Sequence, residues 1–567
     1  MPRYRFAVDS PLGLLRLLLT LFIIYVTYGS SVSLWAQGDP TWRAGEGLLV
    51  GSEAERYLRV LQLAEKAPLY VWTMRGIAPH EVPALLPVST DHPWRDRMDF
   101  TAGRPGGLEF GWVRPKAEFL SNSAYPFGEN DGAMWAGRGL TAVAGVGGFL
   151  SFGLLHIRLA PEGFWTENGN FDLADNGESG EAVYWDERRP AAIDQPQRFG
   201  DQGYRRLSLG SSALHVKLPG VTLGVSGAGQ QWGPALHYPL LLGNNAGGFL
   251  HIFGQTSGPV DLWALRLQGR YLLGWPNQSD FSPVGTDAGR QIVTGATVVM
   301  VPRGIDGLEL GLARFIHNLY PDGSFQGRDI LRVFTGVTYD FMSDRNKPLE
   351  NQMASLFFRW VFPGAGVEVY GELIKEDFQR DLRHTIEEPD DLMGRVFGFQ
   401  KVWQRSGEGL AVLRGEMVNA QVHHSERFGR LRLWDAAGIT GGGGPITLYM
   451  HHSGVVYHTH LGQILGSPTA YGGAGWTLGM DFFDESGRWT VDLFRALQSE
   501  FSQIHTGTTG PEISDVIYGL KLEGMQFRNG VEWTVALTPS LNLNRNLVED
   551  NDVFNLAVRF SIRGFPW

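Results

Sequence analysis

The feature that most constrains the fold is an alternation of apolar and polar residues that recurs from about Leu108 to the end of the chain. In "VEWTVAL", Val531, Trp533 and Val535 alternate with polar neighbours, and "VFNLAVRFSI" repeats the pattern with Phe554 to Ile562 on even positions. A period of two residues is that of a β-strand with one apolar face. Similar segments include 214–218, 265–271, 308–313 and 367–373, so most of the chain is predicted to be antiparallel sheet.

Two β architectures fit this pattern: a soluble sandwich with its polar row in water, and a membrane barrel with its apolar row in lipid. The composition favours the barrel, since the chain has 75 Gly, 12% aromatic residues and no Cys. At roughly ten residues a strand with turns, the alternating part supplies about 16 to 20 strands. Closure of such a sheet removes edges that lipid cannot hydrogen-bond. We therefore expect an all-β transmembrane barrel.

The first 36 residues are predicted to be a secretory signal peptide. Arg3 and Arg5 precede the apolar run Leu17 to Tyr28, and small residues lead to Ala36. An uncleaved anchor helix is the alternative, because the apolar run is long for a signal core. A small N-terminal helical subdomain is expected over 37–107, where Ser52 and Glu55 have capping-box spacing before a helical period. The barrel is expected over 108–567.

No later segment is a convincing transmembrane helix. The best candidate, Gly139 to Leu155, has five Gly in 17 residues, which weakens a helix. Two short strands with a turn at Gly147-Gly148 are predicted there instead.

The charge and the histidines exclude two other kinds of binding protein. A net charge of −11 without a Lys/Arg cluster argues against a nucleic-acid partner. His458 and His460 share one strand face, but no third ligand at a usual spacing accompanies them, so no metal or other cofactor is expected.

Catalysis is not expected either. The chain has no G-x-S-x-G nucleophile motif. Glu368 and Glu372 flank Tyr370 on one strand face, but the acidic run that follows them, residues 376–391, offers no apolar surround to keep one carboxyl protonated, as a glycosidase requires. A hydrolase remains the least favoured alternative.

Carbohydrate binding requires a less specific arrangement of residues than catalysis does, because sugars bind through aromatic faces and through planar hydrogen-bonding groups. Turn formers and interfacial aromatics are the alternative interpretation of the same residues. The candidates are Asp131, Trp135, Arg138, Trp232, Tyr238, Asn244, Asn245, Glu368, Tyr370 and Glu372.

The stretch Gln230 to Gly248 is too apolar for a surface loop and too interrupted by Gly, Pro and Asn for a strand. Irregular backbone inside a barrel is tolerated where protein buries it. We therefore predict that Trp232-Gly233-Pro234 ends a strand begun near Val221 and that the stretch narrows the lumen. Asn244 and Asn245 would cap its own turns, and Phe249 would start the next strand.

Several stretches together resemble the capsule assembly Wzi family: "NSAYPFGENDGAMWAGRGL", "WGPALHYPLLLGNNAGGFLHIF", "NQMASLFFRWVFPGAGVEVYGE" with "EEPDD", and "HTHLGQILG". The resemblance implies an outer-membrane barrel of about 18 strands with a small helical bundle. It also implies lectin-like retention of capsular or extracellular polysaccharide at the cell surface, without catalysis. The expected partners are that polysaccharide and outer-membrane lipid, and the barrel is expected to be a monomer. A porin or channel for a solute is the alternative function.

Overall fold

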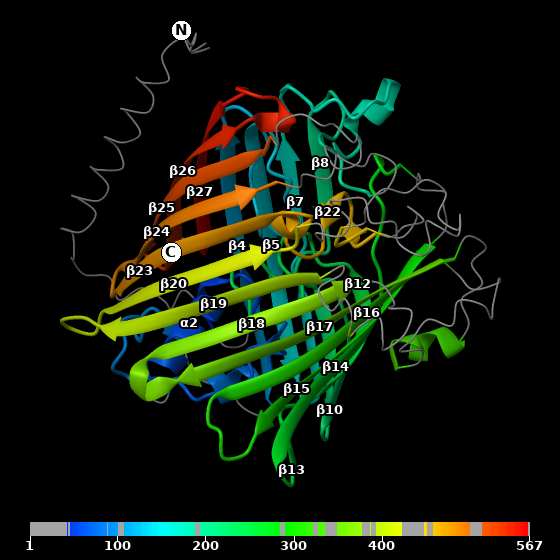
Figure 1. Ribbon diagram of the computed structural model, residues 1–567. Coiled ribbons are helices and arrows are strands. Elements are labelled where there is room, and N and C mark those ends of the chain that lie inside the picture. The colour runs from blue at the N-terminus through cyan, green and yellow to red at the C-terminus, as the bar shows by residue number, and fades with distance from the viewer. Residues whose placement is uncertain are drawn as a thin grey trace.

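A closed antiparallel barrel dominates the computed structural model (Figure 1). The structure describes residues 42–43, 46–87, 89–99, 107–187, 193–283, 290–320, 327–334, 349–376, 386, 393–421, 447–450, 457–498 and 513–564. Three strands of the barrel wall are each interrupted and so carry two labels: β6 with β7, β8 with β9, and β12 with β13. When each of these pairs is counted as one barrel strand, the described strands form a barrel of 18. The predicted strand number is confirmed. The predicted signal peptide, 1–36, lies outside the described residues.

Each barrel strand pairs with its neighbours in the sequence, and the last strand pairs with the first to close the barrel. The strands are β4 (Leu108–Asn122), β5 (Gly139–Phe152), β6 (Leu155–Leu159), β7 (Glu162–Thr166), β8 (Tyr204–Ser208), β9 (Ala213–Leu218), β10 (Val221–Ser226), β12 (Leu250–Thr256), β13 (Val260–Leu262), β14 (Leu265–Trp275), β15 (Arg290–Pro302), β16 (Leu308–Tyr320), β17 (Leu349–Phe362), β18 (Val367–Glu376), β19 (Met393–Gln404), β20 (Leu410–Asn419), β23 (Ala474–Asp484), β24 (Gly487–Leu497), β25 (Val516–Arg528), β26 (Val531–Leu543) and β27 (Val553–Gly564).

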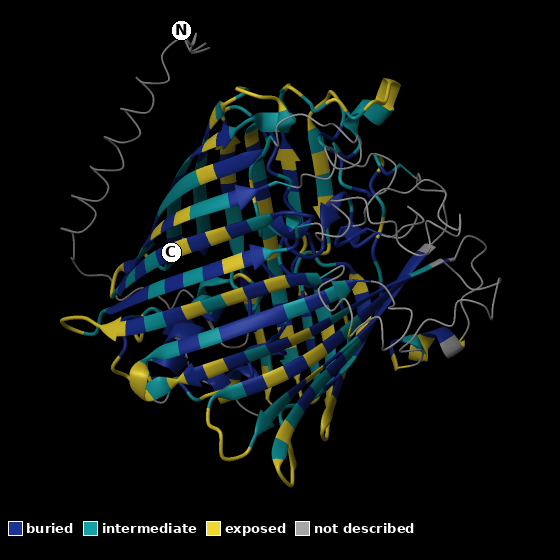
Figure 2. Cartoon of the chain, viewed as in Figure 1, coloured by how far each residue is buried: buried dark blue, intermediate teal, exposed yellow. Residues whose placement is uncertain are grey.

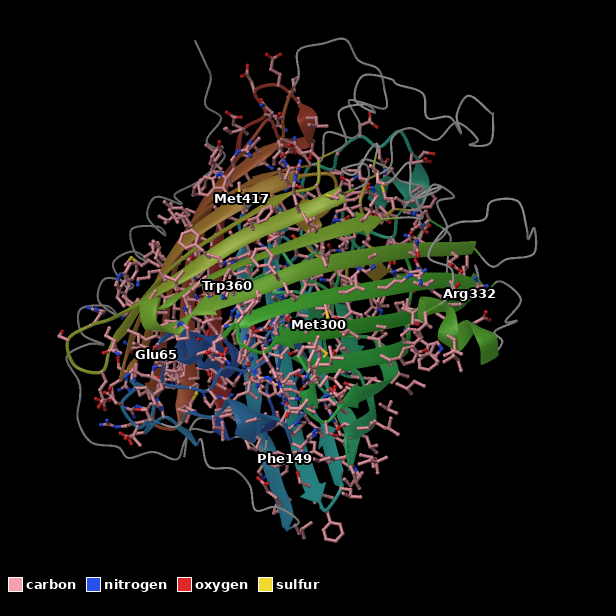
Figure 3. All side chains as sticks on the ribbon, turned by 60° about the horizontal axis from the view of Figure 1, so that its bottom comes forward. Glu65, Phe149, Met300, Arg332, Trp360 and Met417 are labelled. Carbon is pink, nitrogen blue, oxygen red and sulfur yellow. The ribbon has the colours of Figure 1, made fainter. Side chains whose placement is uncertain are left out.

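Side chains alternate between the outer and inner faces of the wall, as the bands along the strands in Figure 2 show. On β18, Glu368, Tyr370 and Glu372 are fully buried inside, whereas Val367, Val369 and Leu373 are only half-buried. Trp360 and Met417, labelled in Figure 3, are among the apolar residues exposed on the outside. The exposed outer row is the surface that lipid covers in a transmembrane barrel.

The two ends of the barrel differ in the length of their connections. One end has tight turns, such as those between β9 and β10 and between β25 and β26. The other end carries the long connections, including 123–138, 167–203 and 227–249. Membrane barrels place short turns on the periplasmic side and long loops outside the cell. We refer to these as the short-turn end and the long-loop end.

The prediction of a turn at Gly147-Gly148 is wrong, because β5 runs unbroken from Gly139 to Phe152. The glycines serve close packing instead. A Cβ at Gly147 would lie 2.3 Å from the carbonyl oxygen of Leu159. This contact lies where the neighbouring barrel strand is interrupted between β6 and β7. Among the described residues, no helix is long and apolar enough to cross a membrane.

The N-terminal segment, residues 46–99, lies inside the barrel at the short-turn end, where α2 (Glu53–Leu63) is drawn in blue in Figure 1. The predicted cap is present, since the Ser52 hydroxyl accepts a hydrogen bond from the Glu55 amide at 3.3 Å. Tyr57 stacks on Trp94 and packs with wall residues such as Phe483 in one hydrophobic cluster. The segment thus shares its core with the wall, and its boundary at residue 107 stays a prediction.

Two further segments fill the lumen towards the long-loop end. The lumen segment, residues 227–249, carries Leu240, Leu241 and Leu242, each at most 2% exposed. The mouth segment, residues 457–473, packs with it and with inward wall residues such as Phe315 in a second hydrophobic cluster. The expectation that the Gln230–Gly248 stretch lies in the lumen agrees with this placement.

Three details of that expectation are wrong. The strand begun at Val221 ends at Ser226, and Gln231–Trp232 forms β11, which pairs with β2 (Met74–Arg75) of the N-terminal segment. The next strand starts at Leu250. Asn244 and Asn245 do not cap their own turns, since their amides donate to the carbonyl oxygens of Asn130 and Ile464. The backbone groups they satisfy belong to neighbouring segments that only the closed barrel brings near.

Candidate functional site

Carboxylates of the inner wall hold the internal segments by their backbone. The Glu416 carboxylate of β20 accepts hydrogen bonds from the amides of Leu236, His237 and Tyr238 at 2.6, 2.9 and 2.6 Å. In the same way Glu309 of β16 accepts from the amides of Trp72 and Thr73 at 2.9 and 3.0 Å. Each carboxylate satisfies donors that irregular backbone would otherwise leave unpaired in the lumen.

Glu368, Tyr370 and Glu372 belong to this internal scaffold. Glu368 accepts from Arg59 of α2 at 2.9 Å and from Arg359 of β17 at 2.7 Å. Glu372 accepts from the Ser355 hydroxyl at 2.9 Å. With both carboxylates at 0% exposure, they lie out of reach of a polymer outside the barrel.

The Tyr370 hydroxyl donates to Glu416 at 2.7 Å, so this ring helps to orient the carboxylate that holds the lumen segment. The ring lies over Gly398 of β19, where a Cβ would come within 2.3 Å of it. Glycine at this position is therefore part of how the wall places the tyrosine.

The histidines of the mouth segment have protein partners rather than a metal site. His458 contacts the carbonyl oxygen of Leu241 at 2.5 Å and the His317 ring at 2.8 Å. His460 accepts from the Asn277 amide at 3.0 Å. Within the described part of the chain, no group of three or more potential ligands could hold a metal ion.

The β4–β5 connection, residues 123–138, lies at the long-loop end and carries three of the candidates. Asp131 forms an ion pair with Arg559 of β27 at 2.5 Å. Trp135 is partly exposed and packs edge-on against Phe199, with ring centroids 5.0 Å apart. Arg138 is also partly exposed, and its Nε donates to the Ser123 carbonyl oxygen at 3.4 Å.

The ten candidates thus divide into two groups. Trp232, Tyr238, Asn245, Glu368, Tyr370 and Glu372 are buried inside the barrel. Trp135, Arg138 and Asn244 are partly exposed, as is the backbone of Asp131, whose side chain is only 5% exposed. Asp131, Trp135 and Arg138 lie together in the β4–β5 connection. The structure therefore does not bring all ten candidates into one accessible site.

Sequence reasoning missed a group of aromatic residues beside Trp135. Phe199 stacks on Tyr204 at a centroid distance of 4.3 Å, and Phe281 packs edge-on against both Phe199 and Tyr184. Tyr184, Phe281 and the neighbouring Trp185 are partly exposed. These rings come from three connections of the long-loop end and from the start of β8, so no local pattern in the sequence could have grouped them.

Glu129 links the β4–β5 connection to the mouth segment, since its carboxylate accepts from the Thr469 hydroxyl at 2.8 Å. Burial, with a smaller contribution from the nearby Asp131 carboxylate, raises the pKa of Glu129 to about 7, although the Thr469 hydrogen bond opposes the shift. The folded state therefore favours the protonated form. Its stabilising contribution is complete below the unfolded-state pKa, about 4.5, and is lost as pH rises through about 7.

We expect Glu129→Gln to flatten part of the pH dependence of stability. In the wild-type protein, ionisation of Glu129 should lower the free energy of unfolding by roughly 1 kcal/mol between mildly acidic and mildly alkaline pH. The effect is modest because Glu129 is only partly buried. The variant should lose less over the same range. Thermal unfolding in detergent at several pH values measures this, and Glu178→Gln, at an exposed position, is the control. Parallel pH profiles for Glu129→Gln and the wild type would contradict the assignment.

Comparison with known proteins bears on the fold. No family model and no curated protein matches the chain. Among solved structures, it is similar to Escherichia coli Wzi, an outer-membrane protein involved in group 1 capsule assembly and a carbohydrate-binding β-barrel. The TM-score is 0.59 at 14% identity, over 92% of this chain and 100% of Wzi. This chain has a Wzi-like fold.

Porins are more distant matches. Pseudomonas aeruginosa OccK5 (OpdH) has a TM-score of 0.37 at 10% identity, with 82% of this chain and 100% of that chain covered. OccK2 (OpdF) of the same organism, solved in complex with glucuronate, has a TM-score of 0.37 at 12% identity, over 82% and 98%. The expected Wzi-like outer-membrane barrel is confirmed as a fold, whereas the ligand is not determined by these likenesses.

Proposed function

We propose that this protein is an outer-membrane barrel that binds capsular or extracellular polysaccharide and retains it at the cell surface. The observation that carries the proposal is the packed interior. The lumen and mouth segments form one hydrophobic cluster with inward wall residues, so the interior acts as a core. Recognition is then left to the long-loop end, which faces the outside of the cell in membrane barrels.

The proposed contact surface surrounds Trp135. It combines the partly exposed rings of Trp135, Tyr184, Trp185 and Phe281 with the Arg138 guanidinium. Aromatic faces pack on the C–H surfaces of sugars, and a guanidinium donates to hydroxyl or carboxylate oxygens. The candidates buried in the lumen are assigned a supporting role instead.

The same packing argues against a wide channel. The carboxylates of the inner wall already accept hydrogen bonds from protein groups, which argues against a hydrolase. Glu368 is held by two arginines, so it is not available as a general acid. A single chain closes the barrel through β27 and β4, so the proposal requires only one copy. The exposed apolar row of the wall would meet membrane lipid.

The direct test is a deletion strain. Loss of the protein should release polysaccharide into the medium while the total amount made stays constant. Unchanged retention in the deletion strain would contradict the proposed function. In planar bilayers the purified protein should give little conductance, because the hydrophobic cluster fills the lumen. Large, stepwise currents would favour the channel alternative.

Trp135→Ala should weaken polysaccharide binding by about tenfold, as expected when one aromatic anchor is lost. Binding of purified polysaccharide to the detergent-solubilised protein measures the effect. Trp263→Ala is the matched control, because Trp263 is 95% exposed in the β13–β14 turn at the short-turn end. Equal affinity in the two variants would exclude Trp135 from the contact surface.

A further inference from the structure

A cavity of about 170 Å³ lies in the lumen. It lies between the N-terminal segment, the lumen segment and the inner wall formed by β4 to β8 and β27. The charged residues that line it are Glu46, Arg114, Lys116, Arg158, Glu162 and Arg563. Four cations and two carboxylates therefore face this space.

A β-bulge in β4 contributes to this excess of cations. The pairing of β4 with β5 shifts register between Val113 and Lys116, so inward positions are odd before the bulge and even after it. Val113, Arg114 and Lys116 all line the cavity as a result. Bulges commonly re-aim side chains in this way.

The carboxylates around the cavity are already bound by two of the cations. Arg114 pairs with Glu46 at 3.2 Å and with Glu532 at 3.3 Å. Lys116 pairs with Glu118 at 3.1 Å and with Glu162 at 3.3 Å. These pairs leave Arg158 and Arg563 to face the cavity.

Arg158 and Arg563 lack carboxylate partners among the described residues. Arg158 is 5% exposed and donates from Nη1 to the carbonyl oxygen of Glu46, while its buried Nε has no partner. Arg563 is half-buried, and its guanidinium makes neither a hydrogen bond nor an ion pair with the described part of the chain, although its backbone pairs with β4 and β26. A buried guanidinium that forms no ion pair is costly, and the half-buried Arg563 adds a second positive charge to the same cavity.

We propose that this cavity binds a small anion through Arg158 and Arg563, by a single phosphate or carboxylate group. An anionic oxygen would satisfy the free Nε of Arg158 and neutralise the pair, and guanidinium groups suit both kinds of anion. The volume accommodates such a group with a few waters, since one water occupies about 30 Å³. This site is separate from the surface around Trp135, so its test is independent of polysaccharide retention.

Calorimetric titration of the purified, full-length protein with inorganic phosphate and, separately, with acetate tests the proposal. At least one of the two should bind saturably, and the comparison shows whether the site prefers phosphate or carboxylate. Arg563→Gln should weaken that binding by about tenfold or more, since one charge-assisted donor is lost. Arg303→Gln is the matched control, because its exposed ion pair with Asp261 lies away from the cavity.

Gly145→Leu is a second variant that leaves both arginines in place. Gly145 lines the cavity, and a Cβ there would make only ordinary contacts, 3.5 Å from the Pro161 carbonyl oxygen and 3.8 Å from Glu162. The leucine side chain should fill the space and abolish anion binding. Absence of binding by the wild type, or unchanged affinity in both Arg563→Gln and Gly145→Leu, would overturn the proposal.

Discussion

Replacing Glu416 with alanine should free the lumen segment from the wall. The substitution removes the acceptor of three backbone amides and of the Tyr370 hydroxyl, all in the interior. Each buried donor left unsatisfied costs about 1–3 kcal/mol, and part of that is regained by water entering the lumen. We expect the substitution to destabilise the closed position of the lumen segment, relative to the open one, by about 3–5 kcal/mol.

A single introduced cysteine can report this change, because the chain has none of its own. Ala235→Cys places the thiol at a position with 0% exposure in the lumen segment. In the Glu416→Ala background the rate of maleimide labelling of this cysteine should rise roughly 100-fold or more. This is the increase expected when the free energy of local opening falls by about 3 kcal/mol. Conductance should rise in the same variant. Glu178→Ala, an exposed glutamate at the long-loop end, should change neither measurement. Slow labelling in Glu416→Ala would show that hydrophobic packing alone holds the segment.

Glu368→Gln should release the N-terminal segment at the other end of the lumen. The neutral amide leaves the Arg59 guanidinium, with a side chain 2% exposed, without its carboxylate. Arg359 keeps its ion pair with Glu309 at 2.7 Å but loses the one with Glu368. Removing one partner of a buried ion pair costs about 3–5 kcal/mol, because an uncompensated charge remains.

Labelling of Ala54→Cys, 1% exposed on α2, follows the release of this segment. The rate should again rise roughly 100-fold in Glu368→Gln. In Glu485→Gln it should not change, because Glu485 has a 78% exposed side chain and a weak ion pair with Arg97. A Glu368→Gln protein that is as protected as the wild type would contradict the inference that this carboxylate anchors α2.

The sequence was sufficient to predict the wall of the barrel. Alternation of apolar and polar residues along β18, β26 and β27 indicates a wall that is mostly apolar outside and mostly polar inside, and this pattern is local. The helix cap at Ser52 is likewise set by residues four positions apart or fewer. Such features need no knowledge of the rest of the chain.

The interior could not be predicted in the same way. The amides of 236–238 are satisfied by Glu416, about 180 residues away, as the shortest of those separations is 178. The aromatic group around Trp135 depends on Phe199 and Phe281, which arrive from other connections. The sequence showed that the Gln230–Gly248 stretch needed shelter, but only tertiary contacts determine which groups provide it. For the same reason the sequence alone could not distinguish a sugar-binding role for Glu368 and Tyr370 from the internal contacts that they make.

The seam between β27 and β4, which pairs Asn122 with Ala557, has a consequence for how the protein forms. The contents of the lumen are contributed by three separate parts of the chain, residues 46–99, 227–249 and 457–473, yet they are enclosed only when the last barrel strand pairs with the first. Arg59 meets Glu368 across 309 residues, and loop closure on that scale is slow. Assembly should therefore be concerted: the polar inner wall and the segments it encloses acquire their partners in one late step. Until that step, a nascent barrel would present its carboxylates and arginines to water, and only the closed molecule would have an interior.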